Sequence, residues 1–193
     1  MMALDDSSAR SDAELLAAYA AGDQSAARAL AYEHGPRVLA LARRLLGGDA
    51  AEAEDVAQEA MLRLWKIAPD WRAGEARIST WLYRVTSNLC TDRLRKRRGV
   101  GLDQASEIPD PAPAAVEEMI AGDRSTVLHA ALAKLPDRQK TALVLRHLQE
   151  LGNPEIAGIM GISVNAVESL LSRGRGELRR VLGRRREELG FEA

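Results

Sequence analysis

Residues 153–172 read NPEIAGIMGISVNAVESLLS, and this stretch carries the strongest structural signal in the chain. Asn153 followed by Pro154 is a helix start, because Asn caps helices and Pro is favoured at the first helical position. Gly161 falls at a sharp turn, where a positive φ costs glycine little, and Ser163 can cap a second helix. Small and apolar residues at these offsets suit two helices that cross steeply over a tight turn. The spacing predicts a helix-turn-helix, with an ordinary helical hairpin as the alternative.

The second helix of this unit favours DNA binding. If Val167 and either Leu170 or Leu171 face inward, the outward face is polar and basic. The first residues of a recognition helix reach base edges in the major groove, where Asn and Arg read bases and Ser contacts bases or phosphates. The alternative for the arginines that follow is a solvated helix end. We expect DNA contacts from Ser163, Asn165, Ala166, Ser169, Ser172, Arg173 and Arg175.

Upstream of this unit, residues 99–123 differ from the rest in composition. They hold three prolines and six acids but no Lys or Arg, which is typical of a linker. On both sides of it apolar residues recur at helical spacing, and no run alternates as a strand would. The sequence therefore predicts an all-α chain. It has a helical bundle over 1–98, a flexible acidic Pro-containing linker over 99–123, and a second bundle over 124–193 that contains the helix-turn-helix.

The first bundle is expected to hold a helix from about residue 50 to 68, with Val56, Ala60 and Leu64 buried. Gly35-Pro36 predicts a break or a fresh helix start further upstream. A second stripe on the 50–68 helix is mostly polar, which is typical of solvated surface. A Trp beside it favours a partner surface, since Trp tends to anchor interfaces. The stripe consists of Asp55, Gln58, Glu59 and Leu62, with Trp65 beside it.

The next helix, which Ser79 can cap, combines aromatic residues with a strongly basic end. Trp81 and Tyr83 lie near its start, and residues 93–98 read RLRKRR. Aromatic rings stack on unpaired bases while cations hold phosphates, so this helix is a candidate single-strand site. The alternative is that both rings belong to the core, and periodicity alone does not separate the two readings.

The bulk properties exclude several classes of protein. Cys90 is the single cysteine, so no internal disulfide forms, which fits a reducing compartment and a buried thiol. No apolar run approaches the roughly 20 residues of a membrane span, and the acidic, polar residues 1–10 lack the apolar stretch of a signal peptide. The three histidines are scattered, without metal-ligand spacing or a phosphate-binding glycine loop. We expect a cytoplasmic protein without membrane insertion, metal or cofactor that is not an enzyme.

Three stretches in this order resemble the sigma factors of the extracytoplasmic-function (ECF) type. Residues 54–65, EDVAQEAMLRLW, resemble the segment that docks on the clamp of the polymerase β′ subunit. Residues 79–85, STWLYRV, with Asn88, Asp92 and the basic block, resemble the segment that melts and reads the minus-ten element. Residues 135–139, LPDRQ, with the helix-turn-helix, resemble the domain that reads the minus-thirty-five element. The resemblance covers nearly the whole chain.

The resemblance implies two helical domains that bind core RNA polymerase, through its β′ clamp and β, together with promoter DNA. It also implies an anti-sigma factor as regulator. By position, Asp55, Gln58, Glu59, Leu62 and Trp65 would meet the polymerase. The minus-ten strand would meet Trp81, Tyr83, Asn88, Asp92, Arg93, Arg95, Lys96 and Arg97. The outward face of the recognition helix would meet the minus-thirty-five duplex. This chain departs from the pattern at Glu168, where a basic residue is common, and at Leu170, where Arg is frequent.

Two other functions are consistent with parts of the sequence. A sigma-like decoy would bind an anti-sigma factor without contacting DNA, and Glu168 favours it because a carboxylate repels phosphate. The full minus-ten and polymerase-docking stretches disfavour it, because a decoy needs neither. A conventional repressor would use the helix-turn-helix but leaves the first hundred residues unexplained.

Overall fold

The computed structural model describes residues 11–72, 74, 76–100 and 128–188 of the chain. These residues are almost entirely helical, and the described part of the chain contains no strand. The predicted all-α class is confirmed. The expected acidic linker lies largely outside the described residues.

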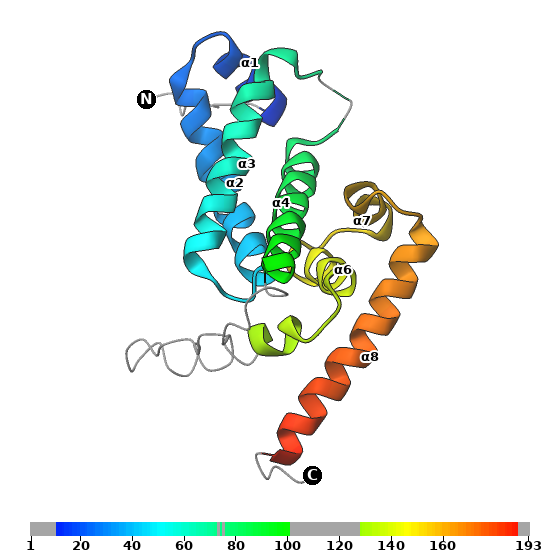
Figure 1. Ribbon diagram of the computed structural model, residues 1–193. Helices are drawn as coiled ribbons and strands as arrows, with labels where there is room; N and C mark the ends of the chain where they lie inside the picture. Colours follow the sequence, from blue (N-terminus) through cyan, green and yellow to red (C-terminus); the bar gives the residue numbers. More distant parts are fainter. Residues whose placement is uncertain (1–10, 73, 75, 101–127, 189–193) are drawn as a thin grey trace, which may run out of the picture.

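The first half is a bundle in which α2, α3 and α4 pack together and α1 lies against α2 (Figure 1). Its elements are α1 (Asp12–Ala20), α2 (Gln24–Leu45), α3 (Ala50–Ile67), the short 3-10 helix η1 (Ala68–Asp70) and α4 (Ile78–Val100). The predicted side-chain caps are present at three helix starts. Ser11 forms a capping box with Glu14, Asp23 Oδ1 accepts from the Ser25 amide, and Asp49 Oδ1 accepts from the Glu52 amide.

The predicted break at Gly35-Pro36 is wrong, because α2 continues through Pro36 as one helix. A proline inside a helix costs about 3 kcal/mol. The buried face of α2 offsets this cost, since Leu30, Val38 and Leu41 are fully buried on both sides of the proline. Burying each such side chain contributes roughly 1.5–3 kcal/mol. Tertiary packing therefore overrides the local helix-breaking signal.

The second half contains the helix-turn-helix. It begins with helical residues 128–133 and continues with α6 (Asp137–Leu148), α7 (Asn153–Met160) and α8 (Val164–Glu188). Gly161, between α7 and α8, has φ 63°, the left-handed conformation expected at this turn. Both α7 and α8 pack against α6, and α8 extends beyond them toward the C-terminus (Figure 1).

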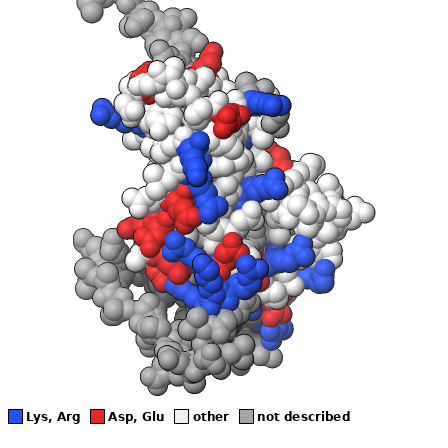
Figure 2. All heavy atoms as spheres, turned by 45° about the horizontal axis from the view of Figure 1, so that its top comes forward, with Lys and Arg blue, Asp and Glu red and all other residues white. Residues whose placement is uncertain are grey.

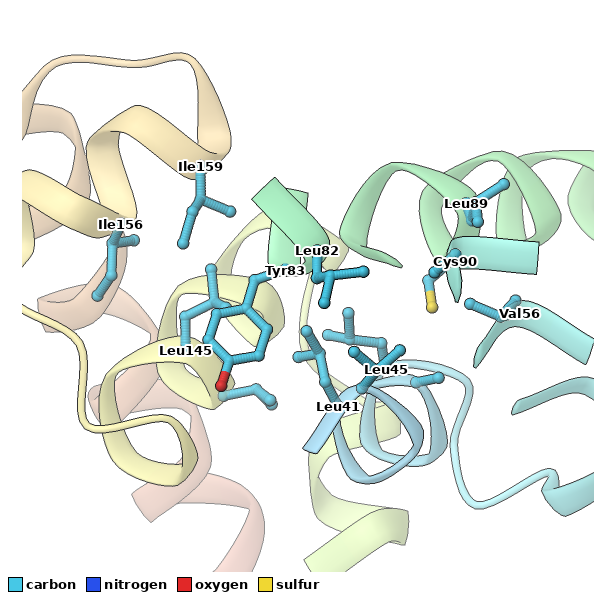
Figure 3. Close-up of a cluster of buried hydrophobic side chains, with 14 of the residues drawn as sticks. Leu41, Leu45, Val56, Leu82, Tyr83, Leu89, Cys90, Leu145, Ile156 and Ile159 are labelled. Carbon is cyan, nitrogen blue, oxygen red and sulfur yellow. The ribbon is translucent and has the colours of Figure 1, made fainter. Parts of the chain in front are cut away.

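The two halves share one continuous core, where two separately packed clusters were expected. α2 contacts α6 and α4 contacts α7. The buried cluster in Figure 3 runs from Leu41 and Leu45 through Tyr83 to Leu145 and Ile159. We call this contact zone the seam.

A buried lysine ties the seam together through the backbone. Lys140 of α6 is almost fully buried, and its Nζ donates a 3.0 Å hydrogen bond to the carbonyl of Leu45, the last residue of α2. The last carbonyls of a helix lack partners within the helix and carry partial negative charge, which an ammonium group complements. One half of the molecule thus caps a helix of the other.

Candidate nucleic-acid interface

The first turns of α8 present the expected outward face. Ser163 Oγ accepts a 3.2 Å hydrogen bond from the Ala166 amide, which confirms the predicted cap. Val167 and Leu171 are buried and Leu170 is half-buried, which settles the open choice in favour of Leu171. Ala166 is half-buried. The exposed side chains on this face are Asn165, Ser169, Ser172, Arg173 and Arg175.

Two side chains on α8 form hydrogen bonds with other residues of the helix-turn-helix. Arg173 Nη2 donates to Ser169 Oγ at 2.9 Å, and its Nε donates to the Ser169 carbonyl at 3.3 Å. Glu168, the departure from the family pattern, accepts a hydrogen bond of 3.5 Å from Asn153 Nδ2 at the start of α7. Glu168 therefore joins the two helices of the motif, which gives this residue a structural role.

A close helix crossing sets the position of α8 on α6. A Cβ added at Gly174 would lie 2.9 Å from Leu143 Cδ1 and 3.4 Å from Gln139 Cβ, so the backbone of α8 lies directly against side chains of α6 here. Nothing lies within 4 Å of a Cβ added at Gly176. The first glycine is required by packing and the second is not.

The stripe on α3 is partly engaged within the fold. Asp55, Gln58 and Leu62 are exposed, and Leu62, at 60% exposure, is a large apolar side chain open to solvent. Trp65 is half-buried and packs against Tyr19 of α1, with ring centroids 4.9 Å apart. The apolar side chain of this stripe that is most open to solvent is therefore Leu62 and not the predicted Trp65.

The two aromatic residues of α4 lie in different environments. Trp81 is half-buried and meets Trp71 edge-on, with ring centroids 6.0 Å apart. Tyr83 is only 5% exposed and lies in the seam, where burial raises the pKa of its hydroxyl. In this conformation Tyr83 is a core residue, and its ring is not accessible to bases.

The cations at the basic end of α4 differ in the acids that they contact. Asn88, Asp92, Arg95 and Lys96 are exposed, and Arg95 Nη2 donates to Asp92 Oδ1 at 2.9 Å. The remaining two arginines with described side chains, Arg93 and Arg97, contact acids of α3.

The contacts between α3 and α4 join residues predicted for two different partners. Arg93 Nη1 lies 3.7 Å from Asp55 Oδ2, and its Nη2 lies 3.7 Å from Glu59 Oε2. One turn further along α4, Arg97 Nη2 lies 2.6 Å from Asp49 Oδ2 and 2.5 Å from Glu52 Oε2. Figure 2 shows acidic and basic side chains lying next to each other on one face of the molecule.

Sequence reasoning missed this pairing because it assigned the acidic stripe and the basic block to separate surfaces. A signal was present, since the acids at 49, 52, 55 and 59 recur at helical spacing. The pKa of Asp49 is lowered, first by its hydrogen bond from the Glu52 backbone and then by Arg97. Asp49 therefore both caps α3 and binds α4.

Other chemistry finds little support among the described residues. They contain no group of three or more His, Cys, Asp or Glu side chains that could hold a metal ion. Burial raises the pKa of the Cys90 thiol to about 12, so the thiol stays protonated and unreactive at neutral pH. Within the same described ranges, every helix is too short or too polar to cross a membrane.

Comparison with known proteins identifies the family. Residues 30–100 match the Sigma-70 region 2 family, and residues 125–178 match Sigma-70, region 4. The chain is 36% identical over 177 residues to the ECF RNA polymerase sigma factor SigM of Mycobacterium tuberculosis, which covers 90% of this chain and 86% of SigM. The chain belongs to the ECF sigma factors. This ECF sigma factor is also 32% identical to SigW of Bacillus subtilis, in a match that covers 83% of this chain and 91% of SigW.

Solved structures show the same fold as this ECF sigma factor. CnrH, in complex with the cytosolic domain of CnrY, matches with a TM-score of 0.66 and 28% identity over 89% of this chain and 97% of CnrH. RpoE of Bartonella quintana, in complex with the anti-sigma factor NepR, matches with a TM-score of 0.64 and 22% identity over 81% and 96%. The resemblance that the sequence motifs indicated is confirmed for fold and family.

Proposed function

We propose that this ECF sigma factor binds core RNA polymerase and directs transcription from promoters that it recognises through a minus-ten and a minus-thirty-five element. The observation that carries the proposal is the outward face of α8. Asn165, Ser169 and Arg173 lie exposed on the second helix of a helix-turn-helix, where base-reading side chains lie. The sigma region 2 match on the same chain supports a polymerase partner.

In this proposal, the two halves of the chain have different binding functions. Residues 1–98 dock on the polymerase and bind the minus-ten strand, residues 99–123 link the halves, and residues 124–193 read the minus-thirty-five duplex. The protein acts in the cytoplasm, performs no chemistry of its own, and is regulated by an anti-sigma factor, as its family implies. The region 2 match over residues 30–100 disfavours the decoy alternative, because a decoy needs neither the polymerase-docking stretch nor the minus-ten stretch.

The distance between the two promoter elements implies that the seam opens. The names place the elements about 25 base pairs apart, or about 85 Å at 3.4 Å per pair. α8, with 25 residues, is about 38 Å long at 1.5 Å per residue. Two halves that share one core do not reach both elements at once. Opening the seam would also uncover Tyr83, so its predicted stacking on bases belongs to the open form.

A run-off transcription assay over genomic DNA tests the proposal. The purified chain with core polymerase should start transcription at specific sites, and an Asn165→Ala/Arg173→Ala variant should lose those sites while retaining core binding. An absence of specific start sites, combined with tight binding to an anti-sigma factor, would instead support the decoy.

A further inference from the structure

The acids along α3 and two arginines of α4 form a series of ion pairs, which we call the ladder. Each arginine with its two acids is one rung of the ladder. Residues 49, 52, 55 and 59 lie on one face of α3, and Arg93 and Arg97 lie one turn apart on one face of α4. Arg97 lies between the two acids at the start of α3, and Arg93 lies between Asp55 and Glu59 one turn further along. The ladder therefore connects the polymerase-docking stripe to the basic block.

The two rungs differ in strength. Arg97 Nη2 donates a 2.6 Å hydrogen bond to Asp49 Oδ2 and lies 2.5 Å from Glu52 Oε2 as an ion pair. Arg93 lies 3.7 Å from each of its carboxylates, beyond hydrogen-bonding range. Glu59 also accepts a 2.6 Å hydrogen bond from Arg63. The Arg93 rung is thus the weaker of the two, held by charge attraction alone.

The weaker rung is also open to competing partners. The side chain of Asp55 is 68% exposed and that of Glu59 is 40% exposed, while that of Arg93 is 26% exposed. Exposed ion pairs contribute little to stability, so a charged partner replaces them easily. A cationic surface on Asp55 and Glu59 would remove the charges that hold Arg93.

We propose that Asp55 and Glu59 are positioning residues that couple polymerase docking to minus-ten binding. In the free chain they hold Arg93 and repel phosphate. Once the polymerase takes these carboxylates, Arg93 turns to a phosphate of the minus-ten strand. A cation that is already neutralised within the protein adds little to DNA affinity, because it has no phosphate contact to make. The coupling rests on the proposed function and adds a reason for the free chain to bind DNA weakly.

Single-strand binding by the isolated full-length chain tests the coupling. The probe is a fluorescein-labelled 20-nucleotide single-stranded DNA, and the key variant is Asp55→Asn. We expect affinity to rise about 1.5- to fivefold, the range set by an exposed ion pair. The plot of log affinity against log salt should steepen by about 0.7, the value for one added phosphate contact on a single strand. Glu59→Gln should add to the effect and should weaken core binding.

Two controls separate the coupling from a general change in charge. Asp70→Asn removes the same charge from an exposed position on η1 away from the ladder, and it should leave DNA affinity nearly unchanged. In an Arg93→Ala background, Asp55→Asn should have no effect, because the cation it would release is gone. An equal gain from Asp70→Asn, or a gain that persists without Arg93, would overturn the coupling. Thermal unfolding verifies that all variants fold.

A second measurement distinguishes the coupling from the proposed function itself. In complex with core polymerase, Arg93→Ala should weaken promoter binding, whereas in the free chain it should leave single-strand affinity unchanged. If wild-type protein initiates at specific sites but Arg93→Ala has equal effects in both states, the coupling fails and the function stands. If wild-type protein initiates nowhere, the proposed function fails whatever the single-strand data show.

Discussion

Under the proposed function, the Arg173 side chain is held in position for DNA before DNA is present. Its two hydrogen bonds to Ser169 hold the guanidinium on the outward face of α8, about two turns from Asn165. A cation fixed in this way loses less conformational freedom on binding than a mobile one. Ser169 therefore acts both as a candidate DNA contact and as a support for its neighbour.

Arg173→Ala should weaken recognition of the upstream element about tenfold, because one good base contact is worth about 1–3 kcal/mol. Band-shift titration of polymerase carrying the variant measures this loss, and a pull-down with core polymerase should show unchanged docking. Lys134→Ala removes an exposed cation from the same half and should have little effect on either. A parallel loss of core binding in Arg173→Ala would place the residue at the polymerase and not on DNA.

Two of the three glycines on α8, Gly174 and Gly176, allow helix propensity and packing to be measured separately within one element. Gly176→Ala should stabilise the fold by up to about 1 kcal/mol, because nothing obstructs the new methyl group and Ala favours helix. Gly174→Ala should instead destabilise it by about 1–3 kcal/mol, because the methyl group meets Leu143. Urea unfolding of the two variants gives the comparison. Equal stabilisation by both would mean that α8 does not cross α6 as closely as described.

The elements that were predicted correctly carry local signals. Asp49 caps α3 through its own side chain, and Gly161 takes a left-handed turn that glycine tolerates. The local signal at Pro36 led to a wrong prediction of a helix break. The free energy that keeps α2 continuous comes from the packing of its buried residues, which a local pattern does not show. The buried Tyr83 and the half-buried Trp81 differ for the same reason. Their neighbours on other helices, and not their spacing on α4, decide their exposure.

At the scale of the whole molecule, the seam was beyond prediction from the sequence. Its residues look like ordinary core members of their own bundles, and the hydrogen bond from Lys140 joins positions 95 residues apart. Arg77 near the start of α4 also lies 3.9 Å from Glu155 of α7. A local sequence pattern does not predict contacts between residues that are so far apart in the chain.

Acid should loosen the seam through His129, which lies beside the turn between α2 and α3. A Cβ added at Gly48 would lie 3.1 Å from His129 Nδ1. The pKa of His129 is lowered from 6.5, first by burial and then by Arg44 and Arg43. Separated halves would take up this proton near pH 6.5 before the packed form does. The contribution of neutral His129 to packing is therefore complete above about pH 6.5 and is lost as pH falls toward its folded pKa.

Small-angle X-ray scattering at pH 7.5 and pH 5.5 measures the effect as an increase in the radius of gyration. His129→Gln keeps a neutral polar side chain and should abolish the pH dependence, with helix content by circular dichroism unchanged. An expansion of the same size in His129→Gln would assign it to other groups.

The shared core also limits how this protein can be recombined with its relatives. Residues of both halves meet across a buried boundary, so a second half from another sigma factor would have to fit around Tyr83 for the closed form to persist. It would also have to supply a cation where Lys140 reaches the end of α2. Under the proposed function, altering the outward face of α8 would change promoter preference while leaving these buried contacts in place.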